Sequence, residues 1–325
     1  MRVELRAPSP PDEPDNLDKF TFVGVTTKES AATRLFPAWT KELGLGDVRL
    51  VGCDLPIHAE RQAYRDVVER IKADEHELGG LVTTHKIDLF QSSTDLFDRI
   101  DENAALCGEV SCLSKRDGLL WARATDPITA GRTLGEFIPE DHWLKTSGEV
   151  LCLGAGGSAI AITVLLVRRV AEAGGPARIT LVDRSGARLE AIRAIHAKLN
   201  AKVKFDYVQN VDPSTNDKLI EDLPPGSLVV NATGMGKDTP GSPITDGARF
   251  PERGLVWELN YRGELQFLRE ALEQREPRRL QVEDGWRYFI HGWMTIIEEV
   301  FHLRIDEDQL SRLAALSEPE RPSRG

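Results

Sequence analysis

One segment combines glycines and apolar residues in the way that a phosphate-binding turn requires. An apolar run of strand length, VLCL over residues 150–153, leads into Gly154-Ala155-Gly156-Gly157-Ser158-Ala159 and then into a long apolar stretch that predicts a helix. Gly154 would permit a tight turn, Gly156 would let the backbone approach a pyrophosphate, and the helix start would offer it free N–H groups. The segment predicts a dinucleotide site, although ordinary strand-to-helix turns carry similar glycines.

Two further segments would complete such a site. The run RITLV is followed by Asp183, whose carboxylate can accept hydrogen bonds from ribose hydroxyls and would repel a 2′-phosphate. That favours NAD, but Arg184 comes next and could hold the phosphate, so NADP remains possible, and Asp183 could instead cap a helix. The run SLVVNATGMG places Asn231, Ala232 and Thr233 after another strand, where a nicotinamide would lie.

The elements that position these residues alternate along the chain. The strand-like runs FTFVGV, VRLVGCDL and LGGLVTT are separated by helical patterns, and a second alternating series starts near Gly148. We predict an α/β fold with an N-terminal α/β substrate domain over residues 18–132 and a Rossmann-type, doubly wound dinucleotide-binding domain over 133–285. The helix 286–312 is expected to pack against the first domain, and residues 1–17 and 313–325 to form a flexible arm and tail.

The bulk properties limit the classes of partner. A formal charge of −11 on 325 residues disfavours nucleic acid and gives no reason to expect a membrane surface. No apolar stretch is long enough to span a bilayer. The four cysteines form no CxxC and no His or Cys group has metal-ligand spacing, so we predict a cytoplasmic protein with reduced thiols and no metal. The expected ligand is a small molecule, and the chain could be a monomer or a homodimer.

Two charged residues of the first domain, Lys86 and Asp126, each follow an apolar, strand-like run. Ligands of open α/β sheets collect beyond the carboxyl ends of the strands, so both side chains could face one cleft. Either could equally be an ordinary surface charge.

The order of the segments resembles the shikimate/quinate dehydrogenase family from about Phe20 to Leu303. GLVTTHK is similar to its G-x-N-V-T-x-P-x-K and ATDPITAG to its N-T-D-G-x-G, which puts Lys86 and Asp126 at the catalytic lysine and aspartate. CGEVSCL resembles G-A-x-N-T-L, while LGAGGSA, VDRS and VVNATGMG resemble the cofactor segments. ELNY resembles D-x-x-Y, with Tyr261 as the tyrosine, and DGWRYFIHG resembles the closing G-x-x-M-L-x-x-Q, with Gly285 near the nicotinamide.

The resemblance implies oxidation of a ring alcohol by hydride transfer to a nicotinamide, while a base removes the hydroxyl proton. Lys86 would be that base if partial burial lowered its pKa towards neutrality. Asp126 would orient Lys86 and the substrate hydroxyl.

The substrate contacts of the family are only partly present. Ser30 remains from its Ser-x-Ser, and Thr83, Ser111 and Tyr261 occupy other contact positions. Five positions that carry hydrogen-bonding side chains in the family motifs differ here: Ala32, Leu81, Ser111, Ala124 and Gly292. We therefore expect a different ring, larger or less polar than shikimate. Trp121, Trp257, Trp286 and Trp293 could line its pocket or belong to the core.

The favoured function is an NAD(P)-dependent dehydrogenase or reductase of a cyclic hydroxy or keto compound. One alternative is a true quinate/shikimate dehydrogenase with altered contacts. Another is a regulatory protein that binds dinucleotide or ligand without turnover. The presence of both Lys86 and Asp126 favours the enzymes, because a sensor needs no proton-transfer pair.

Overall fold

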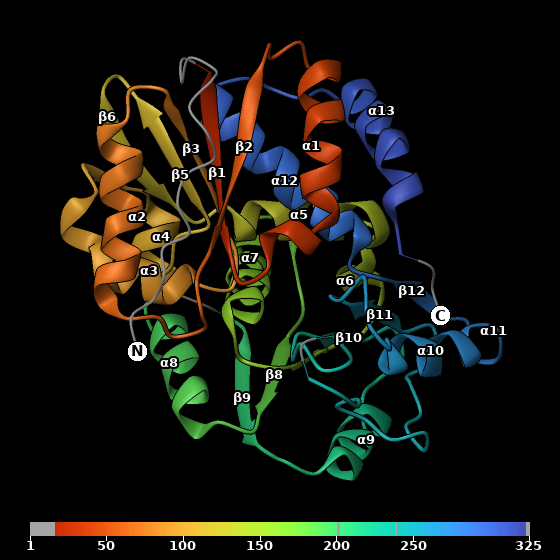
Figure 1. The fold of residues 1–325 in the computed structure, drawn as a ribbon. Coiled ribbons are helices and arrows are strands. Elements are labelled where there is room, and N and C mark those ends of the chain that lie inside the picture. Colours follow the sequence, from red (N-terminus) through yellow and green to blue (C-terminus); the bar gives the residue numbers. More distant parts are fainter. Residues whose placement is uncertain (1–16, 200–201, 238, 323–325) are drawn as a thin grey trace.

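The computed structural model describes residues 17–199, 202–237 and 239–322, which form two α/β lobes that lie one above the other in Figure 1. The predicted arm at residues 1–17 lies outside the described residues except for Leu17, and so do the last three residues of the predicted tail. None of the described helices has the length and apolar character needed to cross a membrane.

The first lobe is built on a mixed six-stranded sheet of order β2-β1-β3-β5-β6-β4. β1 pairs in parallel with β2 and β3, whereas β5 is antiparallel to both β3 and β6. The strands are β1 (Asp18–Gly24), β2 (Val48–Asp54), β3 (Glu77–Val82), β4 (Arg99–Ile100), β5 (Cys112–Arg116) and β6 (Leu119–Arg123).

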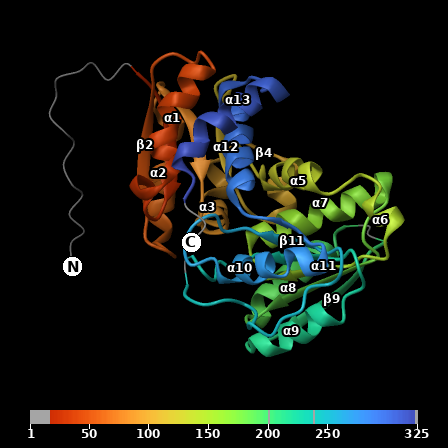
Figure 2. The ribbon, with the colours of Figure 1, turned by 90° about the vertical axis from the view of Figure 1, so that its right-hand side faces the viewer.

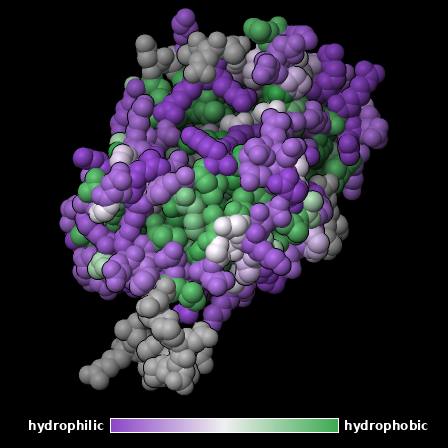
Figure 3. All heavy atoms as spheres, turned by 90° about the horizontal axis from the view of Figure 1, so that it is seen from above, coloured by the Kyte–Doolittle hydropathy of each residue, from purple (hydrophilic) through white to green (hydrophobic). Residues whose placement is uncertain are grey.

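Helices cover both faces of this sheet because its strands alternate their apolar side chains between them. Phe20 and Phe22 face one core with α1 (Ala31–Glu42), whereas Val23 faces the other with α2 (Arg61–Ala73) and α3 (Lys86–Ser93). The short α4 (Glu102–Cys107) precedes β5. Seen from above, apolar side chains gather in the middle of the molecule and polar residues surround them (Figure 3).

The second lobe contains a wholly parallel six-stranded sheet of order β12-β11-β10-β7-β8-β9. This is the doubly wound order of a Rossmann fold, and the winding reverses between β7 and β10. The strands are β7 (Val150–Leu153), β8 (Arg178–Asp183), β9 (Lys204–Gln209), β10 (Leu228–Asn231), β11 (Leu255–Glu258) and β12 (Gln281–Glu283).

Residues of β7 alternate between the two cores of this lobe. Val150 and Cys152 face α7 (Gly157–Ala173) and α8 (Gly186–His196), whereas Leu151 and Leu153 face α9 (Pro213–Glu221) and α10 (Gln266–Glu273). The short α11 (Arg275–Arg278) leads into β12.

The chain then returns to the first lobe. α12 (Trp286–Phe301) packs on the first sheet, where Trp293 makes an edge contact with Phe22 at a ring-centroid distance of 5.0 Å. α13 (Glu307–Ser317) lies beside α1, as both ribbon views show (Figures 1 and 2).

Short helices precede β5 and the second lobe. Residues 104–107 belong to α4, which Asp101 caps by accepting a hydrogen bond from the Ala104 N–H. α5 (Asp126–Phe137) ends before Pro139, which disfavours helical backbone at the residue before it, and α6 (His142–Lys145) follows.

Two expectations differ from the structure. The single helix expected over 286–312 is interrupted after Phe301, where His302 adopts φ 55°, and the expected tail from residue 313 differs because α13 continues to Ser317. Leu313 is buried in the core of the first lobe. The wholly buried indole of Trp39 donates a hydrogen bond of 2.9 Å to the Ser317 hydroxyl. Trp39 thus ties the end of α13 to α1.

We expect Ser317→Ala to lower the free energy of unfolding by about 1–3 kcal/mol, because it leaves the Trp39 N–H buried without an acceptor. Urea denaturation measures the difference. The control is Ser311→Ala in the same helix, whose exposed hydroxyl bonds only the Glu307 carbonyl; its effect should stay within about 0.5 kcal/mol. Equal losses in the two variants would contradict the role of the Trp39 contact.

Candidate active site

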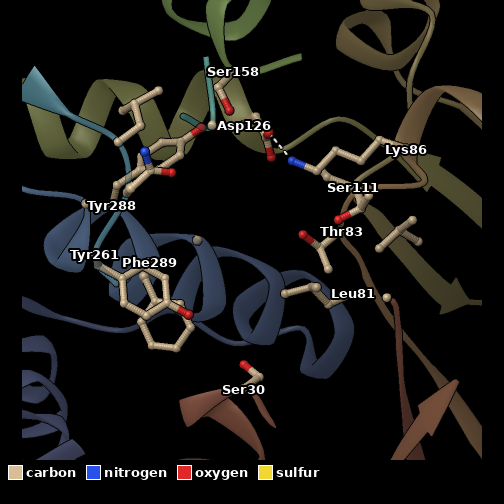
Figure 4. Close-up of a pocket in the computed structure, with 18 of the residues that line it drawn as sticks. Ser30, Leu81, Thr83, Lys86, Ser111, Asp126, Ser158, Tyr261, Tyr288 and Phe289 are labelled. Carbon is tan, nitrogen blue, oxygen red and sulfur yellow. Dashed lines mark hydrogen bonds and ion pairs between the residues drawn. The ribbon is translucent and has the colours of Figure 1, made fainter. Parts of the chain in front are cut away.

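A cavity of about 600 Å³ opens between the ends of the two sheets. Figure 4 shows Lys86, Ser111, Thr83 and Leu81 on one side of it and Tyr261, Tyr288 and Phe289 on the other. Of the residues predicted from the sequence to act in catalysis or in cofactor or substrate binding, those that line this cavity are Ser30, Thr83, Lys86, Ser111, Asp126, Ser158, Ala232, Thr233, Tyr261 and Gly285.

Lys86 and Asp126 meet because each is the first residue of a helix that follows a strand. β3 ends at Val82, Thr84 adopts the left-handed region with φ 61°, and α3 begins at Lys86. β6 ends at Arg123 and α5 begins at Asp126. The two side chains form an ion pair inside the cavity (Figure 4), with 21% and 9% of their surfaces exposed. Both stay accessible to a small molecule in the cavity.

The expected direction of the Lys86 pKa is wrong. Burial acts to lower the pKa, but the charges of Asp126 and Glu109 and the hydrogen bond to Asp126 outweigh it, so the pKa of Lys86 is raised. The resting side chain is therefore an ammonium.

Ser111 helps to position the ion pair of Lys86 and Asp126 by bonding the residue before Asp126. Its buried hydroxyl accepts a hydrogen bond of 2.8 Å from the Thr125 N–H and lies 2.9 Å from the Thr125 hydroxyl. These bonds fix the backbone immediately before Asp126. Ser111 therefore orients the start of α5 in addition to lining the cavity.

The remaining wall is largely aromatic and aliphatic. The rings of Tyr261 and Phe289 lie 4.7 Å apart, and Trp293 and Leu81 also line the cavity. The Ser30 hydroxyl caps α1 by accepting a hydrogen bond from Ala32 N at 3.3 Å, and it points toward the cavity in Figure 4.

Of the four tryptophans considered from the sequence, Trp293 lines the cavity, whereas Trp121, Trp257 and Trp286 are not among its lining residues. Trp257 is wholly buried in the core of the second lobe.

The glycine turn after β7 has the geometry of a phosphate cradle. Gly154 has φ 111° and donates a hydrogen bond of 2.6 Å to the Val182 carbonyl, and a Cβ on it would lie 2.5 Å from the Ala232 carbonyl. A Cβ on Gly156 would meet nothing within 4 Å, and no side chain caps the start of α7. Ala155 and Ala159 are buried beneath the turn. The open backbone and free helix start fit a pyrophosphate.

Asp183 ends β8 but directs its carboxylate at backbone. One oxygen accepts a hydrogen bond from Ala155 N and the other from Ser185 N, each at 2.8 Å. Asp183 therefore joins the glycine turn to the end of β8, and the helix cap of α8 is Ser185. Arg184 is exposed beside it.

Asn231 is wholly buried and organises the loop after β10. Its amide donates a hydrogen bond of 2.7 Å to Glu258, and its carbonyl oxygen accepts one of 2.7 Å from the Thr233 hydroxyl. Burial raises the pKa of Glu258 to about 8. Ala232 and Thr233 reach the cavity from this loop, and Gly285 also lines it. The loop thus touches the cavity at the switch point of the sheet.

Two polar residues near the ion pair were not identified from the sequence. Glu109 is wholly buried, and burial followed by the charge of Asp126 raises its pKa to about 7 although Lys86 opposes the shift. The Tyr288 hydroxyl lies beside Ser158 and Asp126 (Figure 4), and burial raises its pKa well above the ordinary value. The sequence did offer a signal for both residues. Glu109 stands where the family motif G-A-x-N-T-L has alanine, and Tyr288 stands where G-x-x-M-L-x-x-Q has methionine.

No protein-family model matches the chain. The chain is 30% identical over 225 residues to an NADP(+) shikimate dehydrogenase of Symbiobacterium thermophilum, covering 67% of this chain and 70% of that one. It is 27% identical over 298 residues to that of Cereibacter sphaeroides, covering 91% and 95%.

Among solved structures, the shikimate 5-dehydrogenase of Listeria monocytogenes in complex with shikimate and NAD aligns with a TM-score of 0.70. The two are 18% identical, and the alignment covers 92% of this chain and 97% of that one. The shared fold extends over both lobes. The alignment with the Symbiobacterium thermophilum enzyme, at 30% identity, covers more than two thirds of that protein. The chain therefore belongs to the shikimate dehydrogenase family of NAD(P)-dependent oxidoreductases that act on a CH–OH group.

Proposed function

We propose that this chain interconverts a ring alcohol and the corresponding ketone of a cyclic compound, with Lys86 and Asp126 as its proton-handling pair. The observation that carries the proposal is the Lys86–Asp126 ion pair inside a cavity that the loop of Ala232 and Thr233 also lines. A proton-transfer group and the nicotinamide side of a dinucleotide site thus share one space.

Each side chain has a distinct task in this proposal. Lys86, an ammonium at rest, donates a hydrogen bond to the oxygen of the ring alcohol or ketone and exchanges a proton with it. Asp126 accepts a hydrogen bond from Lys86 and keeps its nitrogen in place. A bound nicotinamide would accept or supply the hydride. The residues of both lobes that surround the ring limit its contact with water.

The wall of the cavity favours a ring with fewer hydroxyl groups than shikimate. Leu81 and Gly292 line the cavity at positions where the family motifs have amide side chains. Tyr261, Phe289 and Trp293 add apolar surface. A site that loses hydrogen-bond partners can discriminate against the polar ligand by as much as about 10⁴-fold. Turnover of shikimate or quinate at ordinary efficiency would instead support a true quinate/shikimate dehydrogenase.

The first experiment follows nicotinamide absorbance with NAD or NADP and a panel of shikimate, quinate, cyclitols and less hydroxylated ring alcohols. We expect turnover of a ring alcohol and a loss of about 10²- to 10⁴-fold in kcat for Lys86→Met, with dinucleotide affinity unchanged. The matched control is Lys72→Met. The half-exposed ammonium of Lys72 pairs with Asp98, and neither residue lines the cavity. Dinucleotide binding without turnover of any ring compound would favour the non-catalytic alternative.

A second prediction concerns the choice of dinucleotide. Both carboxylate oxygens of Asp183 already accept backbone hydrogen bonds, whereas Arg184 is exposed at the edge where an adenosine ribose would lie. We expect Arg184→Ala to raise KM for NADP by about 10-fold or more while KM for NAD changes little, since a guanidinium–phosphate bond is charge-assisted.

The control for this test is Arg193→Ala on α8, the helix that follows Arg184; the Arg193 guanidinium stacks on Tyr207 at 4.6 Å from the ring centre. Steady-state kinetics with both dinucleotides check the result. An equal rise in KM for NAD and NADP would show that Arg184 does not contact the 2′-phosphate.

A further inference from the structure

We propose that Glu109 relays protons to and from Lys86, so that the proton exchanged with the substrate oxygen is taken up and returned by a carboxylate within the protein. Glu109 acts through Lys86 and does not touch the substrate. The inference rests on the proposed function, and it concerns a side chain that stands where the family motif quoted above has alanine.

One backbone hydrogen bond holds the segment of Glu109 beside Lys86. Glu109 lies between α4 and β5, and the next residue, Val110, donates its N–H to the Lys86 carbonyl at 3.1 Å. The side chain is 0% exposed, and neither carboxylate oxygen has a hydrogen-bond partner among the described residues. A buried polar group without a partner destabilises the folded chain, and more so when it is charged, so its presence requires an explanation.

The surroundings of Glu109 come from five elements. Lys86 on α3 is the nearby cation, and the other ionisable groups are Asp126 on α5, Tyr288 on α12 and Cys107 on α4. On α7, the absence of a side chain at Gly157 makes room for the carboxylate, since a Cβ there would lie 2.6 Å from Oε2. One ammonium thus serves two carboxylates, and only Asp126 is bonded to it at rest.

The carboxylate of Glu109 near Lys86 provides an acceptor for the proton that Lys86 must lose before it can act as a base. An ammonium cannot accept a proton, so oxidation requires Lys86 to lose one first, and Asp126 and Glu109 raise the pKa of Lys86. Glu109, whose pKa burial raises to about 7, can accept that proton, whereas Asp126 forms the ion pair with Lys86. The two carboxylates therefore have separate tasks.

The steps balance as follows. In oxidation, a proton passes from the Lys86 ammonium to the Glu109 carboxylate, leaving an amine and a carboxylic acid. The amine takes the hydroxyl proton of the ring alcohol while the hydride leaves the same carbon for the nicotinamide, giving the ketone. Glu109 later releases its proton to solvent. Reduction runs the same steps backwards. Rotation of the flexible Lys86 stem, or one water between the groups, completes the path.

The test is the pH dependence of kcat for oxidation of the ring alcohol that the panel identifies. In the wild type, the rate should rise through a transition near pH 7 as Glu109 ionises. Glu109→Gln keeps the shape of the side chain but accepts no proton. We expect its rate at neutral pH to fall by on the order of tenfold, with the transition moved to higher pH and the rate recovering in alkali, while KM for the dinucleotide is unchanged.

Glu270→Gln is the matched control. Glu270 on α10 is also buried with one partnerless oxygen among the described residues, and burial raises its pKa to about 7, but neither Lys86 nor Asp126 is among the charges that act on it. Its variant should keep the wild-type profile. A Glu109→Gln profile with the wild-type transition, or one reduced equally at every pH, overturns the relay.

A measurement without substrate separates this proposal from the proposed function. Infrared difference spectra should show a carboxylic acid that ionises near neutral pH in the wild type and is missing in Glu109→Gln. In Lys86→Met the ionisation should move to higher pH, because the ammonium that favours the carboxylate is gone. If no ring compound is turned over, the proposed function fails while these spectra still test the coupling of the two residues. Absence of the signal, or no movement in Lys86→Met, overturns the relay.

Discussion

The ion pair of Lys86 and Asp126 constrains the rest of the site, because two charges removed from water must compensate each other. Desolvation costs several kcal/mol for each ion unless the geometry of the pair repays it. Asp126 gains from its place at the start of α5, where the helix dipole favours an anion, whereas Lys86 starts α3, where a cation is disfavoured. The lysine is therefore held by carboxylates, and its pKa rises in spite of burial.

This requirement links the two sheets. α3 and α5 begin beyond the ends of β3 and β6, so both charged residues reach the edge of the first sheet that faces the glycine turn of the second. α12 starts directly after Gly285 in the second lobe and packs on the first, which places Tyr288 beside the pair. The helix that joins the lobes thus also closes the cavity, and a change in its position would alter substrate and dinucleotide contacts together.

Periodicity and loop chemistry made much of this predictable. Strands with apolar residues on both faces, separated by amphipathic helices, indicated the two α/β lobes, and Gly154 marked the turn after β7 because no side chain fits there. The sequence could not show that both carboxylate oxygens of Asp183 accept hydrogen bonds from backbone amides, or that the Ser111 hydroxyl accepts one from Thr125. These bonds depend on the distance between loops.

The direction of the Lys86 pKa was mispredicted for the same reason. Burial alone was considered, whereas Glu109 approaches Lys86 from a segment 23 residues further along the chain, fixed by a backbone bond that no local pattern reveals.

The composition of the cavity also limits how the protein can select its substrate. Polar sites reject a wrong ligand strongly because an unmatched donor or acceptor is left buried, whereas an apolar wall gains only about 1–3 kcal/mol from each well-placed methylene. With Leu81, Phe289 and Trp293 around the ring, selection rests on shape for most of the ligand. In the proposed mechanism the reacting oxygen is the exception, because Lys86 would contact it directly. Specificity for the position of the hydroxyl group is therefore expected to be stricter than specificity for the rest of the ring.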